Sequence, residues 1–361
     1  MLLTSALFAV LSPPQAPSFF QLELAVPGAP ERVLVSPLDS GPTDDIMLMS
    51  NVSSGVYDLW TVGLVGSQLK IEVQSGLTEL GYIDPVSMAQ EDLNGDGNLD
   101  VGLAPLFNPQ YYVGGGDISM SPGSFLPTFG GSQHAVGFTD IDGNGTPDSV
   151  LLVNDLGGWF LDYGLNDGTG AFGNSSFVYA PGTSVYEARM IFADVGGQGA
   201  VSTFVTGGTG LARSNWPGGS STNELLLAGD YAEVAAADLD GVNGLDLVLC
   251  GRDRNGIVVL LNDGSGNFPT AQAHITGRFP ESVAAADLDG DGDVDLAVAN
   301  RDGDSVTVLC GDGAGGFTNC GKYAVGREPV DIAAGDVDGN GKVDLVVACS
   351  VGGELSVLLG L

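Results

Sequence analysis

The stretch DLDGDGDVD, from Asp287 to Asp295, has an aspartate at every second position. Carboxylates this close together repel one another unless a cation lies among them. Oxygen side chains at positions one, three, five and nine, with the backbone carbonyl of position seven, can wrap a hard cation as the first half of an EF-hand loop does. Gly292, at position six, allows the sharp turn that this wrapping requires. The stretch therefore predicts a metal site.

Three other stretches keep every element of this motif: DLNGDGNLD from Asp92, DIDGNGTPD from Asp140 and DVDGNGKVD from Asp336. The predicted side-chain ligands of the four loops are Asp92, Asn94, Asp96 and Asp100; Asp140, Asp142, Asn144 and Asp148; Asp287, Asp289, Asp291 and Asp295; and Asp336, Asp338, Asn340 and Asp344. The predicted carbonyl donors are Asn98, Thr146, Asp293 and Lys342. Only the main chain is used at this seventh position, so any side chain is tolerated there.

Calcium suits these loops better than magnesium, because a flexible all-oxygen loop with several carboxylates favours six to eight ligands over a strict octahedron. Zinc would need histidine or cysteine nearby. We therefore expect Ca²⁺ at about four sites, in a structural role, since protein oxygens that fill the coordination sphere leave little room for an activated water. The alternative is that Asp-Gly turns make good loops without metal, as in GRDRNG from Gly251.

Three more copies of the motif have lost ligands. In DLDGVNGLD, from Asp238, Val242 replaces a ligand and Asn243 replaces the glycine, so weak binding or none is expected. We expect two further loops to be empty, because they keep only Asp194 and Gln198 in DVGGQGAVS, and Asp39 and Asp45 in PLDSGPTDD.

The elements that position these loops follow from the repeat. Motif copies begin at 37, 92, 140, 194, 238, 287 and 336, which gives seven units of about fifty residues, the length of a four-stranded propeller blade. In the cleanest copy ESVAAAD leads into the loop, VDLAVAN leaves it, and SVTVLCGD follows a short turn. These runs, rich in Val, Ala and Leu, are typical of strands. A second turn, NDGTGAF, NDGSGNF or GDGAGGF, follows the third strand, and its phenylalanine is expected to pack between blades.

The last unit has room for only two strands after its acidic loop, VDLVVACS and GELSVLLGL. At the other end of the chain, LELAVPGAPERVLVSPLD matches GKYAVGREPVDIAAGDVD of that unit. A strand over residues 20–27 is therefore expected to complete the last blade. The prediction is an all-β, seven-bladed propeller of four-stranded blades, a single domain over residues 17–361 closed by its N-terminal strand.

The stretches GREPVDIAAGDVDGNGKVDLVVACSVGGELSVLLG and GRFPESVAAADLDGDGDVDLAVANRDGDSVTVLCGDGAGGF resemble FG-GAP or VCBS-type repeats. Such repeats build the propeller of integrin alpha subunits and many bacterial extracellular proteins. The resemblance is strong from about residue 230 to 361, fair over 90–172 and weak elsewhere. It implies a calcium-binding scaffold for adhesion or ligand recognition, and it specifies no unique activity.

Composition limits the partners. The chain has 45 acidic and 11 basic residues and a net charge of −34, which argues against nucleic acid or an anionic membrane. An apolar run over residues 2–11 is too short to span a bilayer, so residues 1–16 are expected to be a signal peptide of a secreted protein without membrane insertion. We expect a monomer.

Cys310 and Cys320 flank a predicted hairpin turn and are placed to cross-link its two strands. The sequence leaves open whether they form a disulfide.

Five arginines offer one candidate for a ligand face. The acidic loops join strands one and two, so turns between strands two and three and between blades lie at the opposite end. The residues expected there are Arg252, Arg254, Arg278, Arg301 and Arg327. They could form a basic patch for an anionic glycan or an acidic protein loop, with local pairing to neighbouring carboxylates as the alternative.

A catalytic role finds little support in the sequence, so no catalytic residue or organic cofactor is predicted. The chain has two histidines, and it contains no GxSxG or P-loop motif. His134 is interpreted as a loop histidine on the ligand face. The leading expectation is binding of an extracellular protein or glycan. The alternatives are a lectin, in which Trp60, Trp159 and Trp216 stack on sugars instead of filling space between blades, and a polysaccharide-active enzyme.

Overall fold

A computed structural model describes residues 17–26, 28–36, 44–53, 56–65, 68–77, 87–104, 110–114, 120–126, 132–155, 158–173, 176–179, 189–196, 201–215, 223–242 and 244–361. The predicted signal peptide, residues 1–16, lies outside this part of the chain. The described residues form four-stranded antiparallel sheets and one short 3-10 helix, η1 (Arg301–Gly303). The prediction of an all-β chain built from four-stranded sheets is confirmed. No helix in these ranges has the length and apolar character needed to cross a membrane.

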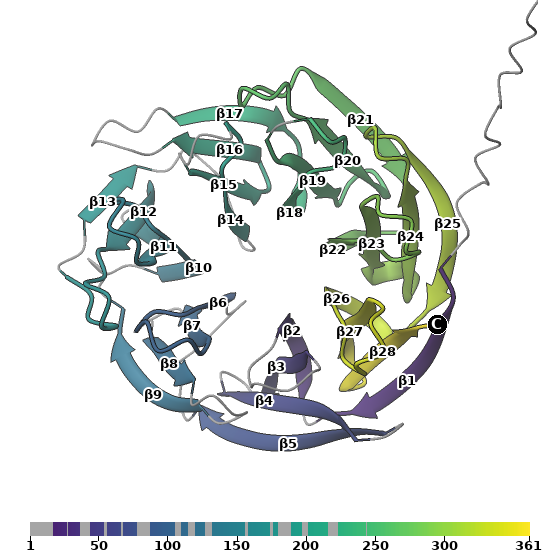
Figure 1. The fold of residues 1–361 in the computed structure, drawn as a ribbon, viewed down its shortest axis with the longest axis horizontal. Helices are drawn as coiled ribbons and strands as arrows, with labels where there is room; N and C mark the ends of the chain where they lie inside the picture. Colours follow the sequence, from purple (N-terminus) through teal and green to yellow (C-terminus); the bar gives the residue numbers. More distant parts are fainter. Residues whose placement is uncertain are drawn as a thin grey trace, which may run out of the picture.

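The described residues make seven sheets, and Figure 1 shows them arranged around a common axis. Six of the sheets use four consecutive strands. These are β2 (Ala29–Ser36), β3 (Asp45–Ser53), β4 (Val56–Val65) and β5 (Gln68–Leu77); β6 (Ser87–Glu91), β7 (Asp100–Ala104), β8 (Gln110–Gly114) and β9 (Met120–Phe125); β10 (Ser132–Thr139), β11 (Asp148–Asp155), β12 (Gly158–Gly164) and β13 (Ser176–Tyr179); β14 (Arg189–Ala193), β15 (Ser202–Gly207), β16 (Gly210–Asn215) and β17 (Asn223–Ala228); β18 (Tyr231–Ala237), β19 (Asp246–Gly251), β20 (Gly256–Leu261) and β21 (Thr270–Ile275); and β22 (Pro280–Ala286), β23 (Asp295–Asn300), β24 (Ser305–Gly311) and β25 (Phe317–Ala324).

The remaining sheet joins the two ends of the described chain. Its order is β1 (Phe19–Ala25), β28 (Glu354–Gly360), β27 (Asp344–Val351) and β26 (Arg327–Gly335). Strand β1 runs antiparallel to β28, with Phe19 opposite Gly360 and Ala25 opposite Glu354. The backbone N–H of Val26 donates to the carbonyl of Gly353 at 2.8 Å, beyond the end of the strand. Strand β1 thus begins one residue before the predicted range of 20–27 and ends at Ala25.

The burial of each strand follows from its place in the sheet. Middle strands such as β23, DLAVAN, are buried at every position, because each sheet is covered on both faces by its neighbours. The outermost strand β21, TAQAHI, instead alternates between exposed and partly buried positions. Continuous apolar runs therefore specify the middle strands, and alternation specifies the outer ones.

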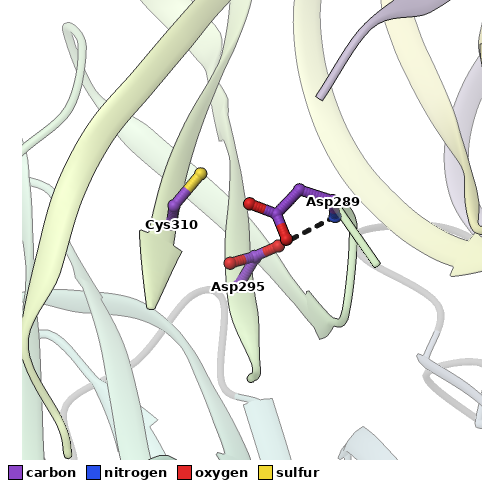
Figure 2. A group of neighbouring side chains, drawn as sticks. All are labelled: Asp289, Asp295 and Cys310. Atoms are coloured by element: carbon purple, nitrogen blue, oxygen red, sulfur yellow. Dashed lines mark hydrogen bonds between the residues drawn. The ribbon is translucent and has the colours of Figure 1, made fainter. Parts of the chain in front are cut away.

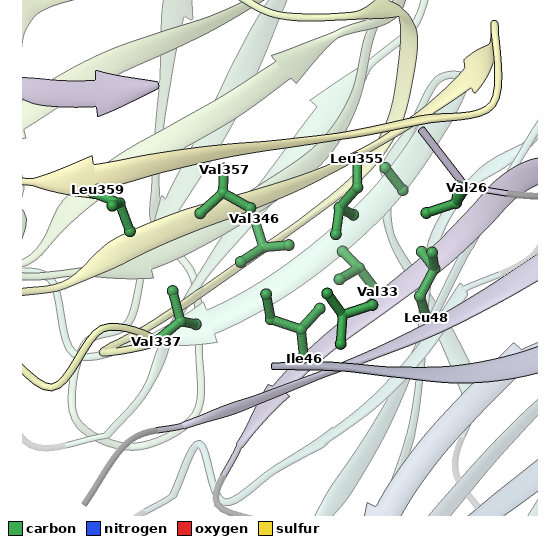
Figure 3. Packing of buried hydrophobic residues seen from close by; sticks show 11 residues of the cluster. Val26, Val33, Ile46, Leu48, Val337, Val346, Leu355, Val357 and Leu359 are labelled. Atoms are coloured by element: carbon green, nitrogen blue, oxygen red, sulfur yellow. The ribbon is translucent and has the colours of Figure 1, made fainter. Parts of the chain in front are cut away.

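The hydrophobic core lies between adjacent sheets. Figure 3 shows one cluster in which Val33 and Ile46, near the N-terminal end of the chain, pack against Val346 and Val357, near its C-terminal end. All four side chains are at most 2% exposed, and burial of one such side chain contributes roughly 1.5–3 kcal/mol. Contacts between residues about 300 positions apart in sequence therefore hold the first and last sheets together.

The phenylalanine of the second turn also packs between sheets, as predicted. Phe268 contacts Phe204 of β15 edge to face, with ring centroids 6.2 Å apart. Phe317 makes the same kind of contact with His274 of β21, at 5.5 Å.

Candidate metal centres

The acidic loops occupy equivalent positions in the fold. Each joins the first strand of a sheet to the second: β6 to β7, β10 to β11, β18 to β19, β22 to β23 and β26 to β27. Because the sheets share one strand order around the axis, these loops lie at one end of the molecule.

Backbone hydrogen bonds curl each loop around its own carboxylates. In the loop from Asp287, this first carboxylate accepts the N–H of Gly290 at 2.8 Å and of Gly292 at 3.1 Å. Both glycines have positive φ, 81° and 94°, which L-residues with side chains rarely adopt. Asp289 and Asp291 each accept the N–H two residues onward, at 3.1 and 2.9 Å. The oxygens of positions one, three and five are therefore turned toward the inside of the loop.

The same pattern recurs in the other three intact loops. The first aspartate of each, Asp92, Asp140 or Asp336, accepts the N–H of the glycine five residues onward at 2.8 or 2.9 Å. The fifth residue of each accepts the backbone N–H of the seventh, Asn98, Thr146, Asp293 or Lys342, and the hydroxyl of Thr146 also donates to Asn144 and to the carbonyl of Asn166.

Carboxylates converge in four loops. Ligand oxygens lie within 4.8 Å of one another in Asp140, Asp142 and Asp148; in Asp238, Asp240 and Asp246; in Asp287, Asp289 and Asp291; and in Asp336, Asp338 and Asp344. Each set supplies only hard oxygen donors, which Ca²⁺ and Mg²⁺ prefer. These residues therefore fit a divalent cation bound by oxygen.

A further group near the same loop combines Asp289, Asp295 and Cys310. Figure 2 shows the two aspartates facing each other, with the N–H of Asp289 donating to the carboxylate of Asp295 at 3.2 Å. Cys310 forms a disulfide with Cys320, which decides the pairing that the sequence leaves open. Its sulfur is therefore no thiolate ligand, and the oxygen character of the site is preserved.

The ninth residue of the motif has a second task. Asp295 is fully buried, and its carboxylate accepts the N–H of Leu288 at 2.8 Å and of Gly311 at 2.9 Å. It thereby ties the acidic loop to the end of β24. Burial raises the pKa of Asp295 to about 6, against the lowering effect of these two backbone N–H groups. Asp344 has the same arrangement, and burial raises its pKa to about 6 as well.

Like charges add to this effect inside the loop. Burial, followed by the charge of Asp291, raises the pKa of Asp289. A cation held among these side chains would favour their ionised forms. The metal-free loop is thus electrostatically unfavourable in a way that a bound cation would relieve.

Two asparagines that the sequence analysis did not single out also support the loops. Asn262 Nδ2 donates to the carbonyl of Leu245 at 3.1 Å, in its own acidic loop, and to that of Val195 at 2.6 Å, in the preceding sheet. Asn166 does the same with Pro147 and Leu93. Both begin the NDGxGxF turn, so the recurrence of asparagine in that turn was the available signal.

Two of the five loops differ from the others in the donors that they supply. The loop from Asp238, expected to bind weakly or not at all, brings three carboxylates together, although Val242 is 45% exposed and supplies no ligand. In the loop from Asp92 the third position is the amide Asn94, so positions one, three and nine supply only two carboxylates, and the backbone N–H groups of Gly95 and Gly97 still donate to Asp92. The sequence motif and the convergence of carboxylates therefore agree in three loops.

The two decayed copies fall partly outside the described residues. Asp39 and Gln198 lie outside them. Asp45 begins β3, and Asp194 Oδ1 accepts the N–H of Gly196 at 3.2 Å.

The arginines at the opposite end of the sheets are mostly paired locally. Arg252 lies 2.9 Å from Glu281, Arg301 lies 3.5 Å from Glu328, Arg254 lies 3.3 Å from Asp253, and Arg278 lies 3.8 Å from Asp302. For these four the structure favours local pairing over a shared basic patch. Arg278 nevertheless keeps 76% of its side chain exposed, and Arg327 is exposed with no ion pair to another described residue.

The remaining candidates lie in the core or outside the described part. Trp159 is 8% exposed and packs with Leu161 and Val205, so it fills space between sheets. The interpretation of His134 as a loop residue is wrong, because it lies in β10 with its ring packed against that of Trp159, and burial lowers the pKa of this histidine. Trp216 and the side chain of Trp60 lie outside what the structure describes.

Comparison with known protein families decides the nature of the repeat. Residues 238–298 and 287–347 each match the FG-GAP-like repeat. This part of the chain consists of FG-GAP-like repeats. The resemblance drawn from the sequence is thus confirmed where the motif copies are cleanest. A search of curated proteins finds no match to the chain.

Solved structures share the fold of this chain at low sequence identity. A lectin from Agrocybe aegerita, described as recognising non-reducing terminal N-acetylglucosamine, is 16% identical, with a TM-score of 0.59 over 95% of each chain. A protein from Lactobacillus plantarum is also 16% identical, with a TM-score of 0.59 over 84% of this chain and 86% of the other. Identity at this level establishes similarity of fold alone.

Proposed function

We propose that this protein is a secreted, calcium-binding β-propeller that recognises an extracellular ligand and performs no catalysis. The observation that carries the proposal is the recurrence of converging carboxylates in equivalent loops at one end of the sheets. Proteins seldom gather like charges repeatedly at the same place in a repeat unless a cation binds there.

In this proposal residues 17–361 form one domain, a monomeric ring of seven blades closed by β1 in the β26–β28 sheet. Closure of this kind removes an exposed sheet edge. The pairing of β1 with β28 and the shared core of the first and last sheets support it.

Calcium would stabilise the ring and take no part in chemistry. Asp287, Asp289 and Asp291 would hold one ion, with equivalent residues of the loops from Asp140 and Asp336 holding others. The loops from Asp92 and Asp238 are weaker candidates, because Asn94 replaces the third carboxylate in the first and Val242 replaces the fifth-position ligand in the second.

The ligand would bind at the other end of the molecule, where Arg278 and Arg327 remain accessible on adjacent sheets. Their planar guanidinium groups suit carboxylate or sulfate groups of an acidic glycan or protein. A neutral glycan is the second candidate, because the Agrocybe aegerita lectin shares the fold over 95% of the chain.

A glycan array probed with the calcium-loaded protein tests this proposal. We expect binding to acidic glycans that weakens in an Arg278→Ala, Arg327→Ala double variant whose calcium affinity is unchanged. Binding to neutral glycans that the double variant retains would favour the lectin alternative. If the protein bound no glycan on the array and cleaved a polysaccharide, the proposal that it performs no catalysis would be contradicted.

A further inference from the structure

The innermost strands carry polar residues at one equivalent position, which is separate from the acidic loops. One position, five residues before each motif start, recurs in all seven innermost strands. It is occupied by Arg32, Ser87, Arg189, Glu233, Ser282 and Asp331, and by Ala135 in the remaining sheet. Four of the seven side chains carry charge, in the part of a repeat protein where neighbouring positions are mostly valine and alanine.

A cavity of about 400 Å³ lies at this level of the axis. Its walls come from β2, β6, β10, β14, β18 and β26, the innermost strands in Figure 1. Arg32, Arg189, Glu233 and Asp331 all line it. The volume is in the range of small-molecule sites.

Four of the residues at this position have an evident structural task. Each accepts a backbone N–H from the next sheet: Ser87 from Val136 at 3.2 Å, Glu233 from Val283 at 3.1 Å, Ser282 from Ile332 at 3.3 Å, and Asp331 from Val33 at 3.0 Å. These hydrogen bonds link the innermost strands of neighbouring sheets. Any residue with an acceptor oxygen could supply them.

The two arginines cannot perform that task, because a guanidinium group has no acceptor. Arg32 is nevertheless only 9% exposed, and its Nε has no hydrogen-bond partner among the described residues. Its Nη1 donates to the carbonyl of Glu31. No ion pair within 4.0 Å joins either arginine to Glu233 or Asp331, although all four residues are described. Arg32 thus lines the cavity with a buried guanidinium whose donors are not all satisfied, and such a group is costly without a further partner.

The charges are segregated around the axis. The strands follow one another in the order β2, β6, β10, β14, β18, β22 and β26. Arg32 and Arg189 therefore begin and end one half of the ring, and Glu233 and Asp331 begin and end the other. The cavity presents donors on one side and carboxylates on the other.

We propose that this axial cavity binds a small zwitterion, such as a free α-amino acid, with its carboxylate toward Arg32 and Arg189 and its ammonium group toward Glu233 and Asp331. A simple anion would meet the two acids and the repulsion of a protein with net charge −34. A simple cation would meet the two guanidinium groups. A zwitterion complements both halves and carries no net charge.

Ligand-observed NMR and calorimetry on the calcium-loaded protein test the proposal, at a pH above 7 so that Glu233, whose pKa burial raises to about 7, is ionised. The probes are the free L-amino acids, with propionate and ethylamine as matched ligands that lack one charge of alanine. We expect at least one amino acid to bind, and propionate and ethylamine not to. Absence of binding by every amino acid, or equal binding of propionate, would overturn the proposal.

Two variants locate the site. Arg189→Gln removes a guanidinium, and Glu233→Gln removes a charge while leaving an amide oxygen for the N–H of Val283. Each should weaken amino-acid binding about tenfold or more. Lys322→Gln and Glu23→Gln, exposed on outer strands, are the matched controls and should bind as the wild type does. Unchanged binding in both variants would contradict the site. If Arg189→Gln folds poorly, Glu233→Gln still tests the opposite wall of the cavity, and unchanged binding in that variant alone would contradict the site.

This site is independent of the proposed glycan recognition. Loss of glycan binding in the Arg278→Ala, Arg327→Ala variant should leave amino-acid binding intact, so the two proposals fail separately.

Discussion

The carboxylate of Asp246 accepts the backbone N–H of Asn262 at 2.7 Å, although its loop has Val242 where the intact loops have a ligand. The other oxygen of Asp246 accepts the N–H of Leu239 at 2.8 Å. Asp148, Asp295 and Asp344 make the same two bonds in loops with full ligand sets. The ninth aspartate is thus retained for a structural reason that does not depend on metal.

Asp246→Ala should destabilise the fold without changing the calcium response. The substitution leaves two buried N–H groups without an acceptor, and each such group costs about 1–3 kcal/mol. We expect a loss of roughly 2–5 kcal/mol in the free energy of unfolding, measured by denaturant titration with and without calcium. A loss seen only when calcium is present would show instead that this residue acts through a bound ion.

Asp287→Ala, in contrast, should change calcium binding. It removes the first ligand of a loop with a full ligand set, so the calcium stoichiometry measured by calorimetry should fall by one. Extracellular modules bind Ca²⁺ with Kd on the order of 0.1–1 mM, so each site contributes up to roughly 1 kcal/mol at millimolar calcium. Asp194→Ala, in a decayed loop, is the control and should leave stoichiometry unchanged. Identical melting curves of the wild type in calcium and in EDTA would argue against the metal sites altogether.

The ion pair of Arg252 and Glu281 should contribute more to the stability of the fold than the pairs of Arg254, Arg278 and Arg301. Their side chains are 11% and 7% exposed, and Glu281 belongs to the next sheet. Removing Arg252 leaves the buried Glu281 without its ion pair and should cost about 3–5 kcal/mol. Removing Glu281 should cost less, because Arg252 still lies 3.8 Å from Asp230, and the double variant should recover much of the loss of the Arg252 variant. Arg278→Ala, at a side chain 76% exposed, should change stability by less than about 0.5 kcal/mol. A double-mutant cycle on thermal unfolding measures the coupling, and additive losses would disprove it.

Stability should depend on pH through Glu233. Burial raises the pKa of this residue from 4.5 to about 7, against the lowering effect of Arg189 and with a further raising effect of Asp331. The folded state therefore binds the proton more tightly than the unfolded state. The contribution of Glu233 to the free energy of unfolding is therefore fully present below pH 4.5 and is lost as the pH rises through about 7.

The Glu233→Gln variant isolates this contribution from that of the loop aspartates. Relative to the wild type, it should gain stability between pH 5 and pH 8, by at most about 3 kcal/mol. Parallel stability curves for the two proteins across that range would contradict the raised pKa.

Much of the fold could be predicted from sequence because it is encoded locally. Runs such as DLAVAN specify strands buried on both faces, and the recurrence of the acidic motif fixes where one strand ends and the next begins. The match between LELAVPGAP and GKYAVGREP also predicted which sheet the first strand would join, since equivalent repeats have equivalent strands.

The number of ligands and the number of carboxylates rank the individual loops differently. Counting ligands favoured the loop from Asp92 over the loop from Asp238, yet only the second brings three carboxylates together among the described residues. The reason is residue type: the third position is the amide Asn94 in the first loop and the carboxylate Asp240 in the second.

The sequence by itself determined the strands, the repeat and the oxygen donors of the acidic loops, because these depend on residue type and short spacing. The tertiary structure decided which charges meet. Arg252 pairs with Glu281, 29 residues away, and Arg32 shares a cavity with Asp331, 299 residues away. Equivalent positions of five inner strands meet at one cavity only after the sheets are arranged around the axis, so no local pattern could show that their charges divide into two halves.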